Sequence, residues 1–452
     1  MIHSFTFDDL NIVLDVHSGA VHIVDEVTRK ILEYYPLKNP HIIKKELSPL
    51  FGYETVEEAL NEVEKLKEQG LLFSNDEIGR EYRPGDNAVI KAMCLHLAHD
   101  CNLRCRYCFA GQGPFGGDRS LMSHRVGKGA LDFLIKHSGP RRNVEVDFFG
   151  GEPLLNFEVL KKLVDYGKTA AAEAGKNIKF TVTTNGINLN ETIAEYLVEN
   201  GLSVVLSLDG RPSVHDKMRP FPGGKGSYNI AAPNIVNFIQ KHNYHNYYVR
   251  GTFTRYNKDF AADVLHMAEL GLKHLSVEPV VGGAGEDYSL RESDIQEVNG
   301  EYEELTRQLL ARRREGREVD FFHFNIDLEG GPCLKKRISN CGAGNEYIAV
   351  TPDGDIYPCH QFVGQEGFKL GDVFNGISNN DTISYFQNAY IYNKEHCPQC
   401  WAKFYCSGGC HANAYFFNDT IYKPYEIGCE LMKKRLECAL YLKAKEMLDD
   451  SE

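Results

Sequence analysis

The strongest constraint on the fold comes from residues 88–285, where short apolar runs alternate with longer amphipathic segments. The amphipathic segments, such as RVGKGALDFLIKHS and FEVLKKLVDYGKTAAAEAG, have the apolar spacing of helices. The apolar runs have the length of strands: VIKAMCLHLA, NVEVDFF, IKFTVTTN, SVVLSL, YYVRGTFT and HLSVEPV. Such alternation builds a parallel sheet with helices outside it, so we predict an α/β fold with a partial (β/α)6 TIM-like barrel. Ligands of such folds bind at the carboxyl ends of the strands.

The chain has 452 residues and exceeds the size at which one hydrophobic core stops growing, so we expect several domains. We place them at residues 1–80, 88–285, 286–332 and 333–452.

The first of these domains has the size of a winged helix. The stretch NIVLDVHSGAVHIVD alternates apolar and polar residues around a turn, which predicts a hairpin. Helices are expected near 24–35 and 40–50, and a third one, with Val56, Leu60, Val63 and Leu66 on one face, ends at Gly70. The polar, Gly- and Pro-containing residues 74–87 are interpreted as a linker.

Two further segments follow the barrel region. The charged run EYEELTRQLLARRREGRE within residues 286–332 predicts a solvent-exposed bridging helix. From Cys333 onward the chain is rich in Cys, Gly and aromatic residues and has little periodicity. A region with so little continuous core usually needs metal to fold.

Composition limits the location and the partners. A net charge of −13 argues against a nucleic-acid partner, because phosphate binding needs clustered Lys and Arg. No apolar run has membrane-spanning length, and the start MIHSFTFDDL lacks the features of a secretory signal. Most of the 13 cysteines are clustered, which favours metal binding in a reducing cytoplasm over a disulfide framework.

Three cysteines directly follow the first predicted barrel strand, in the sequence CNLRCRYC: Cys101, Cys105 and Cys108. A closed tetrahedral metal site has four ligands, so this set leaves one position open. One interpretation is a [4Fe–4S] cluster with one iron free for a small molecule. The alternative is a zinc site completed by a distant residue such as His96 or His99.

Polar motifs also end the second, third and fourth predicted strands. The glycines of GGEP can let backbone approach a ligand closely, and Glu152 can accept a hydrogen bond from an ammonium group. The motifs TTNG and SLDG place amide, hydroxyl and carboxylate groups at strand ends, although turn chemistry alone also explains them. These motifs supply the candidates Gly150, Gly151, Glu152, Asn185, Ser207 and Asp209.

The C-terminal cysteines form a second constellation. The turn in AVTPDGDIY predicts a hairpin that brings Cys341 and Cys359 toward one another. The later cysteines are too dense for one zinc ribbon, so two metal sites are expected to share Cys341, Cys359, Cys397, Cys400, Cys406, Cys410 and Cys429. Cys94 and Cys438 lie in strand and helix patterns and are predicted core residues.

The loop CNLRCRYC, with Tyr107 before the third cysteine, resembles the signature of the radical S-adenosylmethionine (SAM) superfamily. The resemblance implies that SAM chelates the open iron, is cleaved to methionine and a 5′-deoxyadenosyl radical, and thereby starts hydrogen abstraction. GGEP resembles the family's motif for the methionine amino group. The implied SAM contacts are Tyr107, Gly150, Gly151, Glu152, Asn185, Ser207, Asp209 and Arg219, with Arg219 and Arg250 as candidates for the SAM carboxylate.

The C-terminal pattern resembles the SPASM extension of radical SAM enzymes, which binds two auxiliary [4Fe–4S] clusters, so three clusters are expected in total. Carried over, one auxiliary cluster is bound by Cys397, Cys400, Cys406 and Cys429, and the other by Cys341, Cys359 and Cys410. Either Cys333 or a substrate thiolate completes the second set, and we favour the thiolate.

Over its whole length the chain resembles the thioether-forming maturases of SCIFF (six-cysteines-in-forty-five-residues) peptides, a sactipeptide group. This implies a cross-link between a Cys sulfur and a carbon of another residue in a Cys-rich precursor peptide. The N-terminal unit resembles winged-helix leader-recognition domains, and a flavodoxin or ferredoxin is the implied electron donor. The alternatives are an anaerobic sulfatase-maturating enzyme, a carbon–carbon cross-linking maturase, and a non-enzymatic electron-carrying scaffold. The scaffold would leave GGEP and SLDG without a purpose.

Overall fold

The computed structural model describes residues 1–35, 37–77, 79, 89–283, 285–328 and 338–449. Cys333 and most of the predicted linker lie outside the described residues. No helix in the described part of the chain is both long and apolar enough to cross a membrane.

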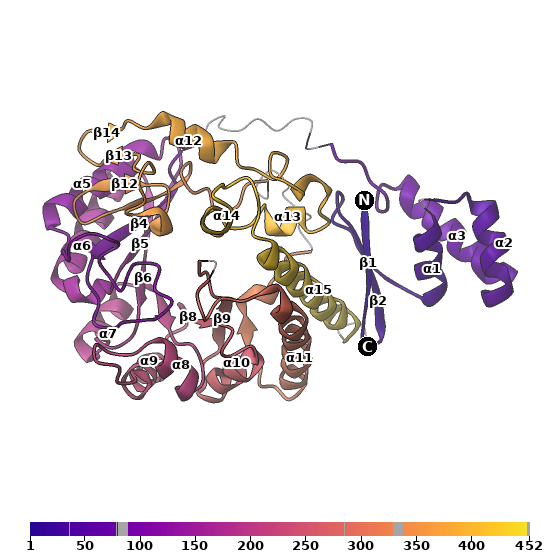
Figure 1. Cartoon of the computed structure of the whole chain (residues 1–452), viewed down its shortest axis with the longest axis horizontal. Helices are drawn as coiled ribbons and strands as arrows, with labels where there is room; N and C mark the ends of the chain where they lie inside the picture. Colours follow the sequence, from indigo (N-terminus) through magenta and orange to yellow (C-terminus); the bar gives the residue numbers. More distant parts are fainter. Residues whose placement is uncertain (36, 78, 80–88, 284, 329–337, 450–452) are drawn as a thin grey trace.

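All six strands predicted for residues 88–285 are present and pair in parallel. They are β4 (Ala92–Ala98), β5 (Asn143–Gly150), β6 (Asn177–Thr184), β7 (Ser203–Ser207), β8 (Tyr247–Phe253) and β9 (His274–Pro279). The connecting helices lie on the outside of the curved sheet (Figure 1). They are α5 (His124–His137), α6 (Phe157–Glu173), α7 (Glu191–Glu199), α8 (Pro212–Met218), α9 (Tyr228–Lys241) and α10 (Phe260–Glu269). The predicted α/β fold with a six-strand parallel sheet is confirmed.

Strand β5 shows how the sequence sorts the two faces of the sheet. Val144, Val146 and Phe148 are fully buried in the main core, together with apolar residues of the outer helices. Side chains alternate across a strand, so Asp147 and Phe149 point to the opposite face, where both line a cavity inside the barrel.

The C-terminal region extends the same sheet beyond β4. Strand β11 (Tyr347–Val350) pairs in parallel with β4 and antiparallel with β12 (Asp355–Tyr357), which confirms the predicted hairpin. Two short strands, β13 (Gly371–Asp372) and β14 (Gly376–Ile377), complete this edge, and β10 (Asp320–Phe321) pairs with β9 at the other. The remaining helices are α12 (Asn380–Gln387), α13 (Lys403–Cys406), α14 (His411–Asn418) and α15 (Glu426–Asp449).

The expectation of a solvent-exposed bridging helix is wrong for one face of α11 (Ile295–Arg314). This helix packs against α10 and α15, and Tyr302 and Leu305 are fully buried in the main core. Most of the charged side chains of α11 lie on the opposite face. They dominate the sequence, so the narrow buried apolar stripe is hard to recognise in it.

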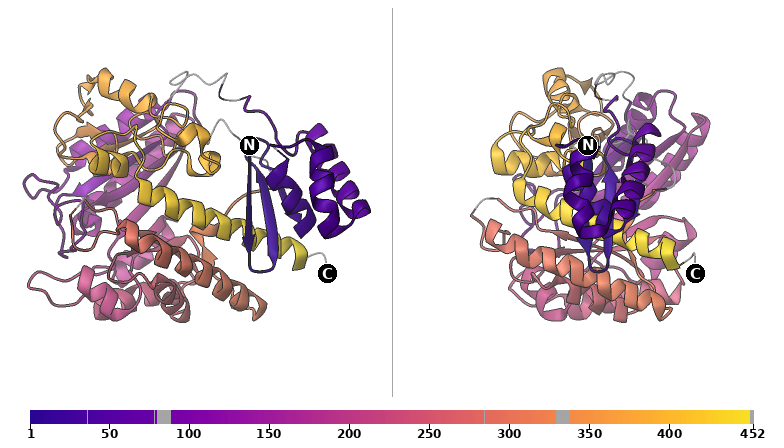
Figure 2. Two further views of the ribbon diagram at one scale, coloured as in Figure 1. Left: turned by 45° about the vertical axis from the view of Figure 1, so that its right-hand side comes forward. Right: turned by 90° about the vertical axis from the view of Figure 1, so that its right-hand side faces the viewer.

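The N-terminal unit has an apolar core of its own, which contains Ile31, Ile43 and Val56. It consists of β1 (Ile2–Phe7), β2 (Leu10–Asp15), β3 (Val21–Val24), α1 (Glu26–Tyr34), α2 (Pro40–Phe51) and α3 (Tyr53–Glu68), in the order β1-β2-β3 within an antiparallel sheet. The three helices stand apart from the barrel, whereas β1 and β2 lie beside α15 (Figure 2).

Candidate functional site

A cavity of about 310 Å³ lies inside the barrel at the carboxyl ends of its strands. Parallel strands in barrels bring their carboxyl ends to one edge, so residues distant in sequence meet there. The candidates that line the cavity are Cys101, Cys105, Tyr107, Cys108, Gly150, Gly151, Asn185, Ser207, Arg219 and Arg250.

The three loop cysteines converge on one side of this cavity. Burial raises the pKa of the Cys101 and Cys105 thiols to about 12, and the Cys108 thiol is close enough to add to both shifts. All three thiols are free of disulfides. Without a metal, three buried thiols this close together would stay protonated. A bound metal would keep them deprotonated. The donor set therefore fits an iron–sulfur cluster.

The two histidines considered as zinc ligands lie together at the end of β4. His96 Nδ1 is 3.1 Å from His99 Nε2, and both rings pack against Phe115. Among the described residues, no group of three or more His, Cys, Asp or Glu side chains is arranged to hold a single metal ion. The cysteines of a [4Fe–4S] site bind different irons and can stand further apart.

The GGEP turn packs directly against the cysteine loop. A Cβ atom on Gly150 would lie 2.2 Å from the Ala98 oxygen, and one on Gly151 would lie 2.1 Å from the Asp100 oxygen. The glycines were expected to admit a ligand. Both line the cavity, and they also allow a close contact with the backbone of β4 and of the cysteine loop.

Glu152 is buried directly behind the cavity wall. Its carboxylate accepts hydrogen bonds from Leu154 N, Thr184 Oγ1 and Asn185 N, at 3.0, 2.8 and 2.9 Å. Burial raises its pKa to about 7, although these hydrogen bonds lower it. The Asn185 amide donates to Asn102 Oδ1 at 2.8 Å, so Asn185 joins Glu152 to the cysteine loop.

Asp209 is also fully buried and acts on the cavity through its neighbours. It accepts from Tyr107 Oη at 2.5 Å, from Arg219 Nε at 3.1 Å and from Thr252 N at 3.0 Å. Tyr107 and Arg219 line the cavity, whereas Asp209 fixes both of them from behind.

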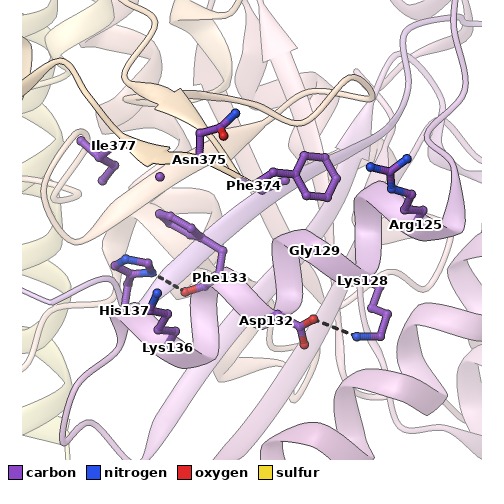
Figure 3. Close-up of a pocket in the computed structure, with 12 residues that line it drawn as sticks. Arg125, Lys128, Gly129, Asp132, Phe133, Lys136, His137, Phe374, Asn375 and Ile377 are labelled. Carbon is purple, nitrogen blue, oxygen red and sulfur yellow. Dashed lines mark hydrogen bonds and ion pairs between the residues drawn. The ribbon is translucent and has the colours of Figure 1, made fainter.

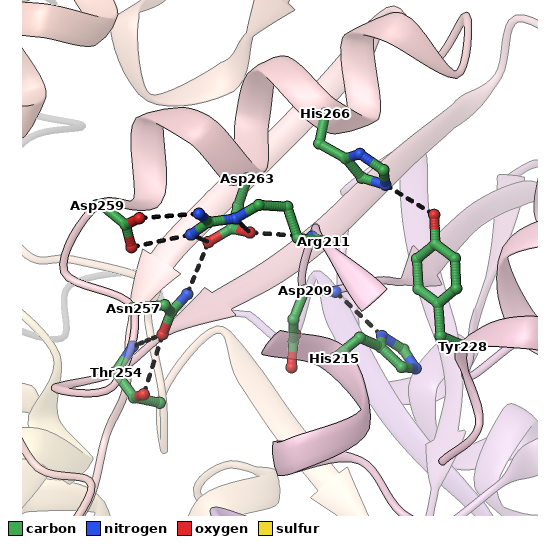
Figure 4. Close-up of polar contacts among 9 residues, drawn as sticks. All are labelled: Asp209, Arg211, His215, Tyr228, Thr254, Asn257, Asp259, Asp263 and His266. Atoms are coloured by element: carbon green, nitrogen blue, oxygen red, sulfur yellow. Dashed lines mark hydrogen bonds and ion pairs between the residues drawn. The ribbon is translucent and has the colours of Figure 1, made fainter. Parts of the chain in front are cut away.

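The turn that carries Asp209 is itself held by a polar network (Figure 4). Arg211 binds Asp259 through two nitrogens, at 2.8 and 2.9 Å, and Asp263 through Nε at 2.8 Å. Asn257 donates to the other oxygen of Asp263 at 3.0 Å. This network ties the SLDG turn to α10 and keeps Asp209 in place.

The C-terminal thiols gather into two groups. Cys397, Cys400, Cys406 and Cys429 all line one cavity of about 380 Å³ beside α15. Burial raises the pKa of Cys429 to about 12, and the other three thiols contribute. Cys341, Cys359 and Cys410 form the second group, in which burial and the neighbouring thiols raise the pKa of Cys359. Each donor set fits an iron–sulfur cluster.

A buried cation lies between these groups. Lys394 is fully buried and donates to the Gly408 oxygen at 2.7 Å. Burial lowers its pKa, whereas nearby thiols from both groups raise it: Cys397, Cys406, Cys410 and Cys341. Sequence inspection did not identify Lys394, because nothing in its local sequence shows that it is buried.

Three further cavity residues were not predicted. These are the titratable residues Asp147 on β5, Glu278 on β9 and His360, which directly follows Cys359. A usable signal existed for Asp147, since it is a polar residue at an inward position of a predicted barrel strand. Cys94 and Cys438 are fully buried, as predicted.

A second hollow, of about 640 Å³, lies on the outer side of the barrel between α5 and the β13–β14 hairpin (Figure 3). Arg125, Lys128 and Lys136 border it, and Asp132 pairs with Lys128 at 2.9 Å. None of the residues that line it is a predicted site residue, so the cavity inside the barrel is the candidate active site.

Comparisons with known proteins agree with this architecture. Residues 90–232 match the family described as a 4Fe-4S single cluster domain, and residues 341–401 match SPASM, an iron-sulfur cluster-binding domain. The radical SAM cyclopropyl synthase TigE of Paramaledivibacter caminithermalis is 23% identical over 423 residues, 87% of this chain and 84% of that protein. A cysteine-type anaerobic sulfatase-maturating enzyme of Clostridium novyi is 26% identical, over 70% of this chain and 86% of that protein.

An uncharacterized protein of Methanocaldococcus jannaschii is 34% identical, but the match spans 30% of this chain and 45% of that protein. Among solved structures, anSMEcpe with bound AdoMet has a TM-score of 0.66 at 21% identity and covers 79% of this chain and 96% of that one. Streptococcus suis SuiB bound to its precursor peptide SuiA has a TM-score of 0.50 at 16% identity and covers 94% and 98%. Two parts of the chain thus match iron–sulfur cluster-binding domain families, and most of its length is similar to a radical SAM cyclopropyl synthase.

Proposed function

We propose that this chain is a radical SAM enzyme that forms a thioether between a Cys sulfur and a carbon of another residue in a Cys-rich precursor peptide. The coarser part, radical SAM modification of a peptide, is supported by relatives that include a cyclopropyl synthase and sulfatase-maturating enzymes.

One observation supports thioether formation in particular. Among the described residues, two thiol groups have three members: Cys101, Cys105 and Cys108, and Cys341, Cys359 and Cys410. The first group lines the barrel cavity, and His360, the residue that follows Cys359 of the second group, lines it as well. The four-thiol group lies in a separate cavity. An open iron on each side of one cavity would suit SAM on one side and a substrate thiolate on the other.

The chain's own residues would hold and orient these groups. Cys101, Cys105 and Cys108 would bind the first cluster, which together with SAM supplies a 5′-deoxyadenosyl radical. Glu152 would accept from the SAM ammonium group, since three donors leave lone pairs free on its oxygens. Tyr107 and Arg219, fixed by Asp209, would form the adjacent wall, and Arg219 would pair with the SAM carboxylate.

The N-terminal unit is the proposed docking site for the leader of the precursor peptide. Strand β3 is the outer strand of the sheet order β1-β2-β3, so its free side can accept a further strand. The SuiB likeness covers 94% of this chain and so includes most of residues 1–80. We further propose a reduced flavodoxin or ferredoxin as the electron donor.

The test is anaerobic incubation of the reconstituted enzyme with SAM, a reductant and the Cys-rich peptide encoded beside it. A thioether removes two hydrogens from the peptide mass and leaves the cross-linked Cys resistant to alkylation. A carbon–carbon cross-link also removes two hydrogens but leaves every Cys open to alkylation. Formylglycine formation from Cys removes its sulfur. Either of the last two products would contradict the thioether proposal and retain radical SAM chemistry.

A further inference from the structure

The two carboxyl groups that line the barrel cavity have contrasting environments. Asp147 projects from β5 and Glu278 from β9, so both are within the walls of the same cavity. When two acidic groups in one site are pushed toward opposite protonation behaviour, they serve different chemical roles.

Glu278 is held as an anion. It pairs with Arg250, and its other oxygen lies 3.8 Å from His323 Nε2. Burial would raise its pKa, but the charges of Arg250, His323 and Arg435 outweigh burial and lower it to about 2. An acid this strong is a poor proton acceptor at neutral pH.

Asp147 has no such cation in hydrogen-bond contact among the described residues. Thr183 Oγ1 donates to its two oxygens at 3.1 and 3.4 Å. Burial raises its pKa to about 7, and Thr183 and the charge of Arg250 lower it only in part. The other titratable groups facing it are the Cys94 thiol of β4 and the Tyr347 phenol of β11.

Position favours Asp147 as well. Strand β4 pairs with both β5 and β11, and the ring of Phe149 on β5 lies 5.1 Å from the ring of His360, which follows Cys359. Asp147, two residues before Phe149 on the same face of β5, is therefore near the second three-thiol group. The remaining titratable group on that side is His360, whose Nδ1 is already engaged at 3.1 Å from Tyr347 Oη.

We propose that Asp147 is the catalytic base that accepts the thiol proton of the substrate cysteine, so that the sulfur is a thiolate before the C–S bond forms. This inference rests on the proposed thioether chemistry. The S–H bond breaks and its proton goes to the Asp147 carboxylate. The C–H hydrogen leaves in 5′-deoxyadenosine, SAM is cleaved to methionine as the two-electron oxidant, and the sulfur binds the carbon. Asp147 then returns the proton to solvent.

The first test compares Asp147→Asn with Glu145→Gln in the full-length reconstituted enzyme. Glu145 lies on the same strand, two residues away, outside the cavity lining. General bases contribute roughly 100-fold or more to rate, so Asp147→Asn should slow thioether formation by about 100-fold. SAM cleavage to 5′-deoxyadenosine, measured in the same samples, should change by less than about threefold because this step does not transfer the thiol proton. Glu145→Gln should leave both rates unchanged.

The second test uses pH, and it stands even if Asp147→Asn folds poorly. In the wild-type enzyme the thioether rate should fall as the pH drops through about 7, because protonated Asp147 accepts no proton. Thr183→Val removes the hydrogen bond that lowers the pKa of Asp147, so this limb should move to higher pH. Deoxyadenosine formation should not show the shift.

The outcomes separate the inference from the proposed function. Thioether formation by Asp147→Asn at nearly the wild-type rate, or a Thr183→Val profile that coincides with wild type, would overturn the role of Asp147 and leave the thioether function intact. A wild-type enzyme that yields another product overturns the proposed function, and the role of Asp147 in C–S bond formation with it.

Discussion

The contact between the GGEP turn and the cysteine loop allows a quantitative prediction for Gly151→Ala. The new Cβ would lie 2.1 Å from the Asp100 oxygen and 2.6 Å from its carbonyl carbon, both backbone atoms. Normal contact requires a displacement of about 1 Å, and a misplacement of about 1 Å in a reacting site can cost about 100-fold in rate. Because Glu152 N donates to the same oxygen at 2.9 Å, the displacement would also move Glu152.

The assay is 5′-deoxyadenosine formation at saturating SAM, with iron content and circular dichroism measured on the same preparation. We expect a loss of about 100-fold with the overall fold retained. Gly117→Ala is the matched control, since its Cβ would lie 3.6 Å from the Pro114 oxygen, an ordinary contact in the same loop. A Gly151→Ala enzyme with nearly wild-type deoxyadenosine formation would refute the view that this contact sets the position of the cysteine loop.

Three further predictions follow from buried charges. Lys394→Met removes the cation between the two C-terminal thiol groups, so the auxiliary clusters should become harder to reduce. A redox titration followed by electron paramagnetic resonance measures this, and unchanged midpoint potentials of the clusters would contradict it. The pKa of Glu152 is raised to about 7, so SAM affinity should weaken as the pH falls through that value, and Glu152→Gln should bind SAM weakly at every pH; a pH-independent wild-type affinity would contradict this. Asp76→Asn leaves the buried Lys403 without its carboxylate partner at 2.7 Å and should lower the free energy of unfolding, measured in urea, by about 3 kcal/mol. The double variant with Lys403→Met should recover most of this loss.

The barrel could be predicted from sequence because each of its strands is long enough to show a buried apolar run. β5 illustrates this, with Val144, Val146 and Phe148 at alternate positions. The strands added at the edges could not be found in the same way. β10, β13 and β14 have two residues each and carry no periodicity, and β11 is recognisable only through the turn of its hairpin.

The candidate site was predictable where residue type and spacing define the chemistry, as in the cysteine loop and the GGEP turn. How deeply each site side chain is buried could not be predicted from the sequence. Glu152 and Asp209 lie one layer behind the wall, because several donors from neighbouring strands surround them. Lys394 was missed because a lone charged residue in a loop gives no sign of whether it is buried, whereas Asp147 could have been found from its inward position on a predicted barrel strand.

Helix α15 connects the parts of the protein that the proposed chemistry must coordinate. Its first turn carries Cys429, which lines the cavity of the four-thiol group. Two turns later, Arg435 donates toward His323 at 3.2 Å, and His323 neighbours Glu278 at the barrel cavity.

The same helix and the thiol segment beside it hold the N-terminal unit. Lys445 of α15 binds Asp9 at 2.7 Å, and Trp401, between two of the cysteines, stacks on His3 with ring centroids 3.6 Å apart. A peptide bound at β3 would therefore be attached to the element that carries one thiol group and contacts the wall of the cavity. Since the geometry at the cavity sets the rate, substitutions that loosen the N-terminal contacts should reduce peptide modification more than SAM cleavage without peptide.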